Sequence, residues 1–258
     1  MGESELHAPE RANRESALHA VVVATAVAVA AMVMQVVTAI PALFVIDFDP
    51  EGTLSLSGFI VLFIASYAGM VLAVWGYLRL SNRGWSYLDL RWPTRRDLKY
   101  IIGGTLGGFA ALTVLGLFVE FLDLPTTPNT ILEPALAGDT TFLLVLVPLV
   151  LLINAPVEEL VFRNVVQKRL YGSLGKGWAI VVASVIFALV HLPVYYHPNL
   201  GATGVMLILI FAGSLVFGWV YARTDNLVVP TVVHGLFNAI NILLLYVYLT
   251  TEPTLGIL

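Results

Sequence analysis

Long apolar runs constrain this chain more than any other feature of its sequence. Two of them, residues 17–44 and 58–80, exceed the ~20 apolar residues that a helix needs to cross ~30 Å of hydrocarbon. Of the 258 residues, 59% are hydrophobic and 12% are charged, whereas a soluble domain carries about 25% charged residues. We therefore predict an all-α fold, a polytopic transmembrane helical bundle with about seven to eight membrane helices.

The charged residues between the spans predict the orientation of the bundle. We expect membrane spans near 17–44, 57–80, 99–121, 141–171, 177–192, 201–222 and 230–250. Lysine and arginine flank alternate connections: Arg79, Arg83, Arg91, Arg95, Arg96, Lys99, Lys168, Arg169, Lys176 and Arg223. The connections between these carry acidic residues instead: Asp47, Asp49, Glu51, Asp123, Glu133 and Asp139. Because positively charged loops remain in the cytoplasm, we expect the N-terminus inside and the C-terminus outside.

Composition also limits the kinds of site and partner. The chain has no cysteine, which excludes a disulfide and a thiolate metal site. A net charge of -4 argues against a nucleic-acid partner. The apolar spans make membrane lipids expected partners. We divide the chain into a cytoplasmic tail (1–16), N-terminal transmembrane helices (17–139) and a membrane core (140–250).

Four ionisable side chains lie inside the apolar runs: Glu158, Glu159, His191 and His234. Such a group costs about 2.5–3.5 kcal/mol at the centre of a membrane helix, and it usually faces the bundle interior or a watery cavity. The glycine-rich segment 171–177 predicts a turn centred on Leu174, with Glu158 16 residues before it and His191 17 residues after it. In two antiparallel helices these residues come level, so we predict a buried reaction centre.

His234 reaches this depth less directly, because it lies only eight residues after Asn226. β-branched residues before Pro230 favour an extended backbone, which covers about 3.3 Å per residue. We therefore expect the segment 226–230 to enter the membrane extended and to bring His234 level with Glu158.

Helix geometry assigns different roles to the two adjacent carboxylates. Residues four apart lie about 40° from one another around a helix, so Arg163 should pair with Glu159. Glu158 is then free to face a cavity, where a carboxylate in apolar surroundings can serve as a general base. His191 could orient or share the same water, and Phe187, one turn earlier, would wall the pocket.

His234 and Asn238 lie on one helix face and could donate hydrogen bonds to a developing oxyanion. A water activator opposite an oxyanion stabiliser is the equipment for amide hydrolysis. A second interpretation uses Glu158, His191 and His234 as a zinc site with an open position. The sequence leaves both open, because water held by Glu158 and His191 alone needs no metal.

Other interpretations need no proteolysis. Glu159 and Arg163 could pin two helices together, and Asn154 and Asn241 could be hydrogen-bonding contacts between helices. Glu158, His191 and His234 could instead relay charge in a proton- or ion-coupled transporter. A third interpretation is a non-catalytic membrane-binding or immunity module, which has the same fold and no activity.

Three motif pieces occur in order: Glu158-Glu159-x-x-x-Arg163, Phe187-x-x-x-His191 and His234-x-x-x-Asn238. This pattern resembles the CPBP family of type II CAAX prenyl proteases and bacteriocin-processing proteins, also called Abi, over residues 140–250. The resemblance implies a multi-pass intramembrane endopeptidase in the cell membrane, with its catalytic cavity open to the cytosol. Family members have been described both as metalloproteases and as metal-independent glutamate proteases, and eukaryotic members cut prenylated CAAX proteins.

The resemblance also implies a role for each motif residue. By position, Glu158 and His191 would activate water. His234 and Asn238 would stabilise the oxyanion, and Glu159 and Arg163 would support the site.

Overall fold

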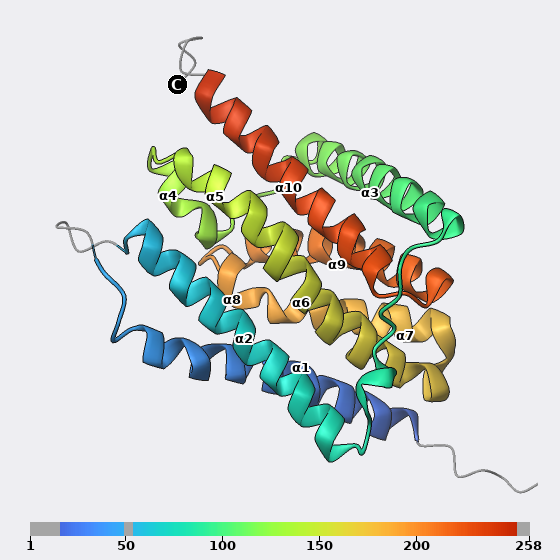
Figure 1. The fold of residues 1–258 in the computed structure, drawn as a ribbon. Helices are drawn as coiled ribbons and strands as arrows, with labels where there is room; N and C mark the ends of the chain where they lie inside the picture. The colour runs from blue at the N-terminus through green and yellow to red at the C-terminus, as the bar shows by residue number, and fades with distance from the viewer. Residues whose placement is uncertain (1–15, 49–53, 252–258) are drawn as a thin grey trace, which may run out of the picture.

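The computed structural model describes residues 16–48 and 54–251, which form a bundle of long helices (Figure 1). The long helices are α1 (Ala17–Ala42), α2 (Leu56–Leu80), α3 (Arg95–Phe121), α7 (Lys168–Val190), α9 (Leu200–Thr224) and α10 (Val228–Thr251). Shorter ones are α4 (Glu133–Leu136), α5 (Thr141–Leu149), α6 (Ala155–Glu159), α8 (Leu192–Tyr195), η1 (Trp85–Tyr87) and η2 (Thr130–Leu132). The predicted all-α polytopic bundle is confirmed. Residues 1–15 of the predicted tail, Asp49 and Glu51 lie outside the described residues.

The longest apolar stretch is a helical hairpin. Six helical stretches of the described chain are long and apolar enough to span a membrane, and one of them, Thr141–Val190, has 50 residues. Gly175 interrupts it with φ 72° and ψ 164°, a conformation that glycine adopts without steric cost. The rings of Phe162 and Phe187 are 5.0 Å apart, whereas 25 residues of straight helix would separate them by about 37 Å. Counted as two arms, this stretch makes seven helical segments, as predicted.

The first arm of the hairpin contains two π-helical segments, η3 (Val150–Asn154) and η4 (Leu160–Gln167), on either side of α6. Pro156 has no N–H, so it cannot form the α-helical hydrogen bond to the carbonyl of Leu152. π-helical turns are rare and occur often at functional sites. Here they flank the short helix that carries Glu158 and Glu159.

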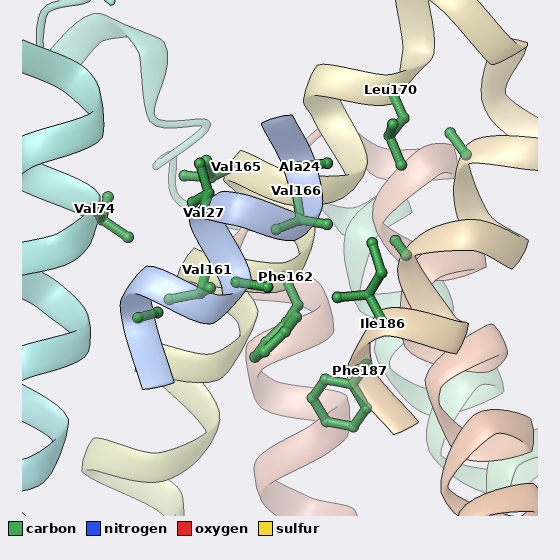
Figure 2. Packing of buried hydrophobic residues seen from close by; sticks show 14 of the residues in the cluster. Ala24, Val27, Val74, Val161, Phe162, Val165, Val166, Leu170, Ile186 and Phe187 are labelled. Atoms are coloured by element: carbon green, nitrogen blue, oxygen red, sulfur yellow. The ribbon is translucent and has the colours of Figure 1, made fainter. Parts of the chain in front are cut away.

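The core beneath this arm is built by α1, α2, η4 and α7. Figure 2 shows Ala24 and Val27 of α1 against valines of η4, and Phe162 beside Phe187. α1 contributes a row of fully buried alanines one helical turn apart, Ala20, Ala24 and Ala28. Small residues let helix backbones approach closely in a membrane, where packing drives association.

The predicted extended entry to His234 is wrong. α10 already begins at Val228, and Pro230 lies in its first turn, where a missing N–H breaks no helical bond. The depth has another origin: Asn226 and Leu227 of the α9–α10 turn are buried, although Asp225 beside them is exposed. The N–H of Leu227 donates to the carbonyl of Asp89 (2.8 Å).

Asp89 also fixes how deep the first arm of the hairpin lies, because its carboxylate pairs with Lys168 of that arm at 2.7 Å. From Leu227 to His234 is about 10 Å of helix. From Lys168 to Glu159 the chain runs through η4, whose π-helical turns rise less per residue than an α-helix, so this length is below the ~13 Å of α-helix. The two side chains therefore come level without any extended segment.

The charge segregation predicted from the sequence is present in the fold. Lys168 pairs with Asp89, Lys176 pairs with Asp225 at 2.9 Å, and Arg91 donates to the carbonyl of Thr224 at 2.7 Å. These contacts gather the α2–α3 connection, the hairpin turn and the α9–α10 turn at one basic end of the bundle. Which side of the membrane this end faces stays a prediction.

Gly69 tests the close contact between α1 and α2, which lie side by side in Figure 1. A Cβ at this position would lie 2.1 Å from the backbone oxygen of Met34, so the helices must separate to admit it. We expect Gly69→Ala to lower the free energy of unfolding by about 1–3 kcal/mol, measured by chemical denaturation in detergent micelles. Gly76→Ala on the same helix is the control, because nothing lies within 4 Å of its added Cβ. An equal effect of both substitutions would contradict the packing argument.

Candidate active site

A fully buried ion pair forms the base of the site. Arg163 Nε donates to Glu159 Oε2 at 3.0 Å, and both side chains have no solvent-exposed surface. Arg163 Nη2 donates to Ser214 Oγ on α9 at 3.1 Å. The guanidinium also lies 5.0 Å from the ring centroid of Phe187 and 6.0 Å from that of Phe217. The pair predicted from the spacing is confirmed, and it joins the first arm of the hairpin to α9.

His234 is held by the second oxygen of the same carboxylate. Its Nδ1 lies 3.0 Å from Glu159 Oε1, and its ring stacks on Phe217 with centroids 4.5 Å apart. An ionised carboxylate only accepts hydrogen bonds, so Nδ1 carries a proton. Nε2 points the other way and lies 4.0 Å from Glu158 Oε2. Glu159 therefore fixes both the ring orientation and the tautomer of His234.

Glu158 is largely buried, with 8% of its surface exposed, and is bound through one oxygen. Its Oε1 accepts hydrogen bonds from the Tyr67 hydroxyl of α2 (3.1 Å) and from the Asn154 amide of η3. The other oxygen faces His234. As predicted, Glu159 and not Glu158 bonds Arg163. That Glu158 faces a cavity and acts as a base stays a prediction.

Asn238 reaches the same network. Its Nδ2 donates to Asn154 Oδ1 at 3.0 Å, so α10 is connected to Glu158 through Asn154. Asn154 does join two helical segments, as expected, but it also binds the carboxylate, which the sequence did not indicate. Asn241 makes no hydrogen bond between helices in the described part of the chain. It is exposed, and its amide donates to the carbonyl of Phe237 in its own helix (2.7 Å).

His191 lies at the end of α7, beside the site. Its Nδ1 is 2.7 Å from the carbonyl oxygen of Phe187, an acceptor only, so Nδ1 carries the proton and Nε2 is left as an acceptor. Phe187 contacts both imidazoles, with centroid distances of 4.5 Å to His191 and 6.0 Å to His234. In the described part of the chain, no hydrogen bond or ion pair joins His191 to Glu158. That the two share a water stays a prediction.

Two tyrosines near Glu158 were missed by sequence reasoning. Tyr67 comes from α2, outside the motif region, and its only signal was a phenol hydroxyl in the middle of a predicted span. Tyr195 of α8 is the other. Burial raises the pKa of Tyr195, Asn129 acts in the opposite direction by hydrogen bonding, and the Glu158 charge adds to the increase.

The proposed zinc ligands are only partly arranged for a metal. Both imidazoles donate Nδ1–H to an oxygen and leave Nε2 free, as metal-binding histidines usually do. Within residues 16–48 and 54–251, however, no three His, Asp or Glu side chains lie close enough together to hold a metal ion. Zinc at Glu158, His191 and His234 stays a prediction, and the steps proposed below use no metal.

Comparison with known proteins supports the motif analysis. Residues 140–240 match the family model described as type II CAAX prenyl endopeptidase, Rce1-like. This segment includes every motif residue from Glu158 to Asn238, so the resemblance to the CPBP family is confirmed there. The match supports a CAAX-type II intramembrane endopeptidase in general terms. Neither the curated proteins nor the solved structures gave a match.

Removal of Arg163 tests whether the buried pair supports the site as a unit. Arg163→Leu leaves the Glu159 charge without its cation, and loss of one partner of a buried pair costs about 3–5 kcal/mol. We expect a smaller cost in a Glu159→Gln background, where no charge is left unpaired and the amide oxygen can still accept from His234. A denaturation series over the wild type, both single variants and the double variant measures this coupling. Equal costs of Arg163→Leu in the two backgrounds would show that the pair is not coupled.

Proposed function

We propose that this protein, whose residues 140–240 match the Rce1-like type II CAAX prenyl endopeptidase family, is an intramembrane endopeptidase. Its substrate would be a membrane-associated or lipidated, CAAX-like protein or peptide. One observation carries the proposal: Glu158 Oε2 and His234 Nε2 face each other at 4.0 Å inside a buried polar network. This separation is too long for a direct hydrogen bond, and it suits groups that act on a shared water or substrate atom.

In the proposed reaction Glu158 is the general base. It removes a proton from a water molecule as the water oxygen bonds to the carbonyl carbon of the scissile peptide, and the carbonyl oxygen becomes an oxyanion. Glu158 then returns the proton to the leaving amine as the C–N bond breaks, so the carboxylate is regenerated. A positioned acid–base group of this kind contributes about 10²–10⁴-fold in rate.

The oxyanion would be stabilised from α10. When both ring nitrogens of His234 carry a proton, Nε2 can donate while Nδ1 stays bound to Glu159. Asn238 uses one amide hydrogen for Asn154, and a carboxamide has a second one to donate. His191, with Nε2 free to accept, would orient the water from the end of α7.

Tyr67 and Asn154 are positioning residues in this proposal. They bind Oε1 of Glu158, which leaves Oε2 directed towards His234. The basic end of the bundle would face the cytoplasm, as positively charged loops do, and so would the opening of the site. A transporter would instead need ionisable groups at several depths of the membrane. Here His234 lies beside both Glu158 and Glu159, so the three groups share one depth.

The first test is hydrolysis of a farnesylated CAAX-type peptide by the detergent-purified protein. We expect Glu158→Gln to lower kcat at least 10²-fold, because the amide cannot accept the proton, and His191→Ala to lower it as well. Glu120→Gln, which removes a carboxylate from the exposed side of α3, is the matched control. Full activity of both site variants would refute the assignment.

Two further comparisons in the same assay test the lipid requirement and the metal requirement. An unlipidated peptide of the same sequence shows whether the lipid is required. Complete removal of metal, followed by addition of zinc, separates the two mechanisms, since activity that survives metal removal contradicts the zinc interpretation.

A second test concerns Tyr67. Tyr67→Phe keeps the ring and removes only the hydroxyl that binds Glu158, so we expect kcat to fall about tenfold, the order of one lost hydrogen bond to a charged group, with little change in KM. Tyr248→Phe, at an exposed position of α10, should leave both constants unchanged. A rise in KM at constant kcat would place Tyr67 in substrate binding instead.

A further inference from the structure

A pocket lies between α3 and α9 at the basic end of the bundle and opens to the surface. It has a volume of about 350 Å³ and is lined by Arg96, Lys99, Tyr100, Gly103, Gly104 and Trp219. None of these residues belongs to the site of Glu158 and His234.

The pocket carries positive charge that the protein does not neutralise. Arg96, Lys99 and the neighbouring Arg223 are exposed, and within the described ranges none of the three forms an ion pair with a carboxylate. Asp97, next to Arg96, is buried and is bound by Arg91 at 2.7 Å, and Asp225, two residues after Arg223, pairs with Lys176 at 2.9 Å. An anion from outside the chain would therefore meet free cationic groups here.

Aromatic rings hold two of these cations in place. Arg96 lies 5.7 Å from the ring of Tyr100, and Arg223 lies 5.7 Å from the ring of Trp219. The two rings are 5.6 Å apart, and Arg96 Nη2 donates to the carbonyl of Arg223 (3.4 Å). Tyrosine and tryptophan typically lie at the level of lipid headgroups.

One helical turn further along α3, the pocket is lined by glycine. A Cβ added to Gly103 would meet nothing within 4 Å, so this position is open space. Gly104, next to it, packs against α9 and α10, with Val220 at 2.8 Å and Val233 at 3.2 Å from an added Cβ. The exposed side chains of Ile102 and Leu106 continue this face along α3.

We propose that the pocket binds the headgroup of an anionic glycerophospholipid. The phosphate would lie against Arg96 and Lys99, the glycerol would cover Gly103, and the acyl chains would follow the apolar face of α3. Basic pockets between membrane helices on the positively charged side bind such headgroups. Charge alone would suit a soluble phosphate ester as well, but the apolar continuation of the pocket favours a lipid. The inference does not depend on the proposed peptidase activity.

Occupancy would affect the stability of the bundle. A lipid bound between α3 and α9 would contact both helices only in the folded bundle. Any ligand that binds only the folded state raises the apparent stability, so binding has a readout that needs no substrate.

The experiment compares phosphatidylglycerol with phosphatidylcholine of the same acyl chains, added to the full-length protein in a neutral detergent. We expect phosphatidylglycerol to raise Tm by several degrees, phosphatidylcholine to have little effect, and native mass spectrometry to detect a retained phosphatidylglycerol. Lys99→Ala should raise the apparent Kd for phosphatidylglycerol about fivefold, which is the effect of one basic residue near the headgroups. Arg95→Ala removes an equal charge from the same helix turn outside the pocket and should not weaken it.

A steric pair complements the charge pair. Gly103→Leu fills the pocket with every cation intact and should abolish the preference for phosphatidylglycerol. Gly116→Leu, at another open position on α3, should preserve it. Equal shifts with both lipids, equal weakening by Arg95→Ala and Lys99→Ala, or the same shift with soluble glycerol phosphate would each overturn the proposal.

Discussion

The interior of this bundle depends on the two hydrogen bonds that the buried carboxylate of Glu159 accepts. One oxygen binds Arg163 and the other binds His234, each at 3.0 Å, so a single buried charge joins the first arm of the hairpin to α10. Arg163 in turn contacts Ser214 of α9. A buried charge is costly unless it is paired, and here both carboxylate oxygens have a partner. The bond to His234 also orients the imidazole, so the same carboxylate links the helices and positions the ring.

Glu158 has different partners from Glu159 because adjacent residues of a helix point about 100° apart. It faces α2 and α10 and is bound by Tyr67 and Asn154 through one oxygen only. The N-terminal helices are thus part of the site, since the Tyr67 hydroxyl reaches the carboxylate across 91 positions of sequence. In Figure 1, α2 and α10 lie on either side of α6, the helix that carries Glu158.

The basic end of the bundle is ordered around another acidic side chain. Asp89 binds Lys168 through its carboxylate and Leu227 through its carbonyl, and the Tyr221 hydroxyl donates to it as well. The α2–α3 connection therefore packs against the α9–α10 turn, where Asn226 and Leu227 are buried and Asp225 stays exposed. This packing brings His234 to the level of Glu159, and it leaves Arg96 and Lys99 facing outward beside α9.

Much of this could be predicted from local sequence, because local patterns decide it. Apolar runs define spans whatever their neighbours, glycine at Gly175 permits the reversal, and a four-residue spacing places Glu159 beside Arg163. The motif residues likewise indicated where polar groups would gather. The part played by Tyr67, the bond between Asn154 and Asn238, and the burial of Asn226 were decided only by the tertiary structure. Each depends on how segments distant in sequence pack side by side, and the expected extended entry to His234 failed for that reason: chain geometry gives the length of a segment, but only packing gives the depth from which it starts.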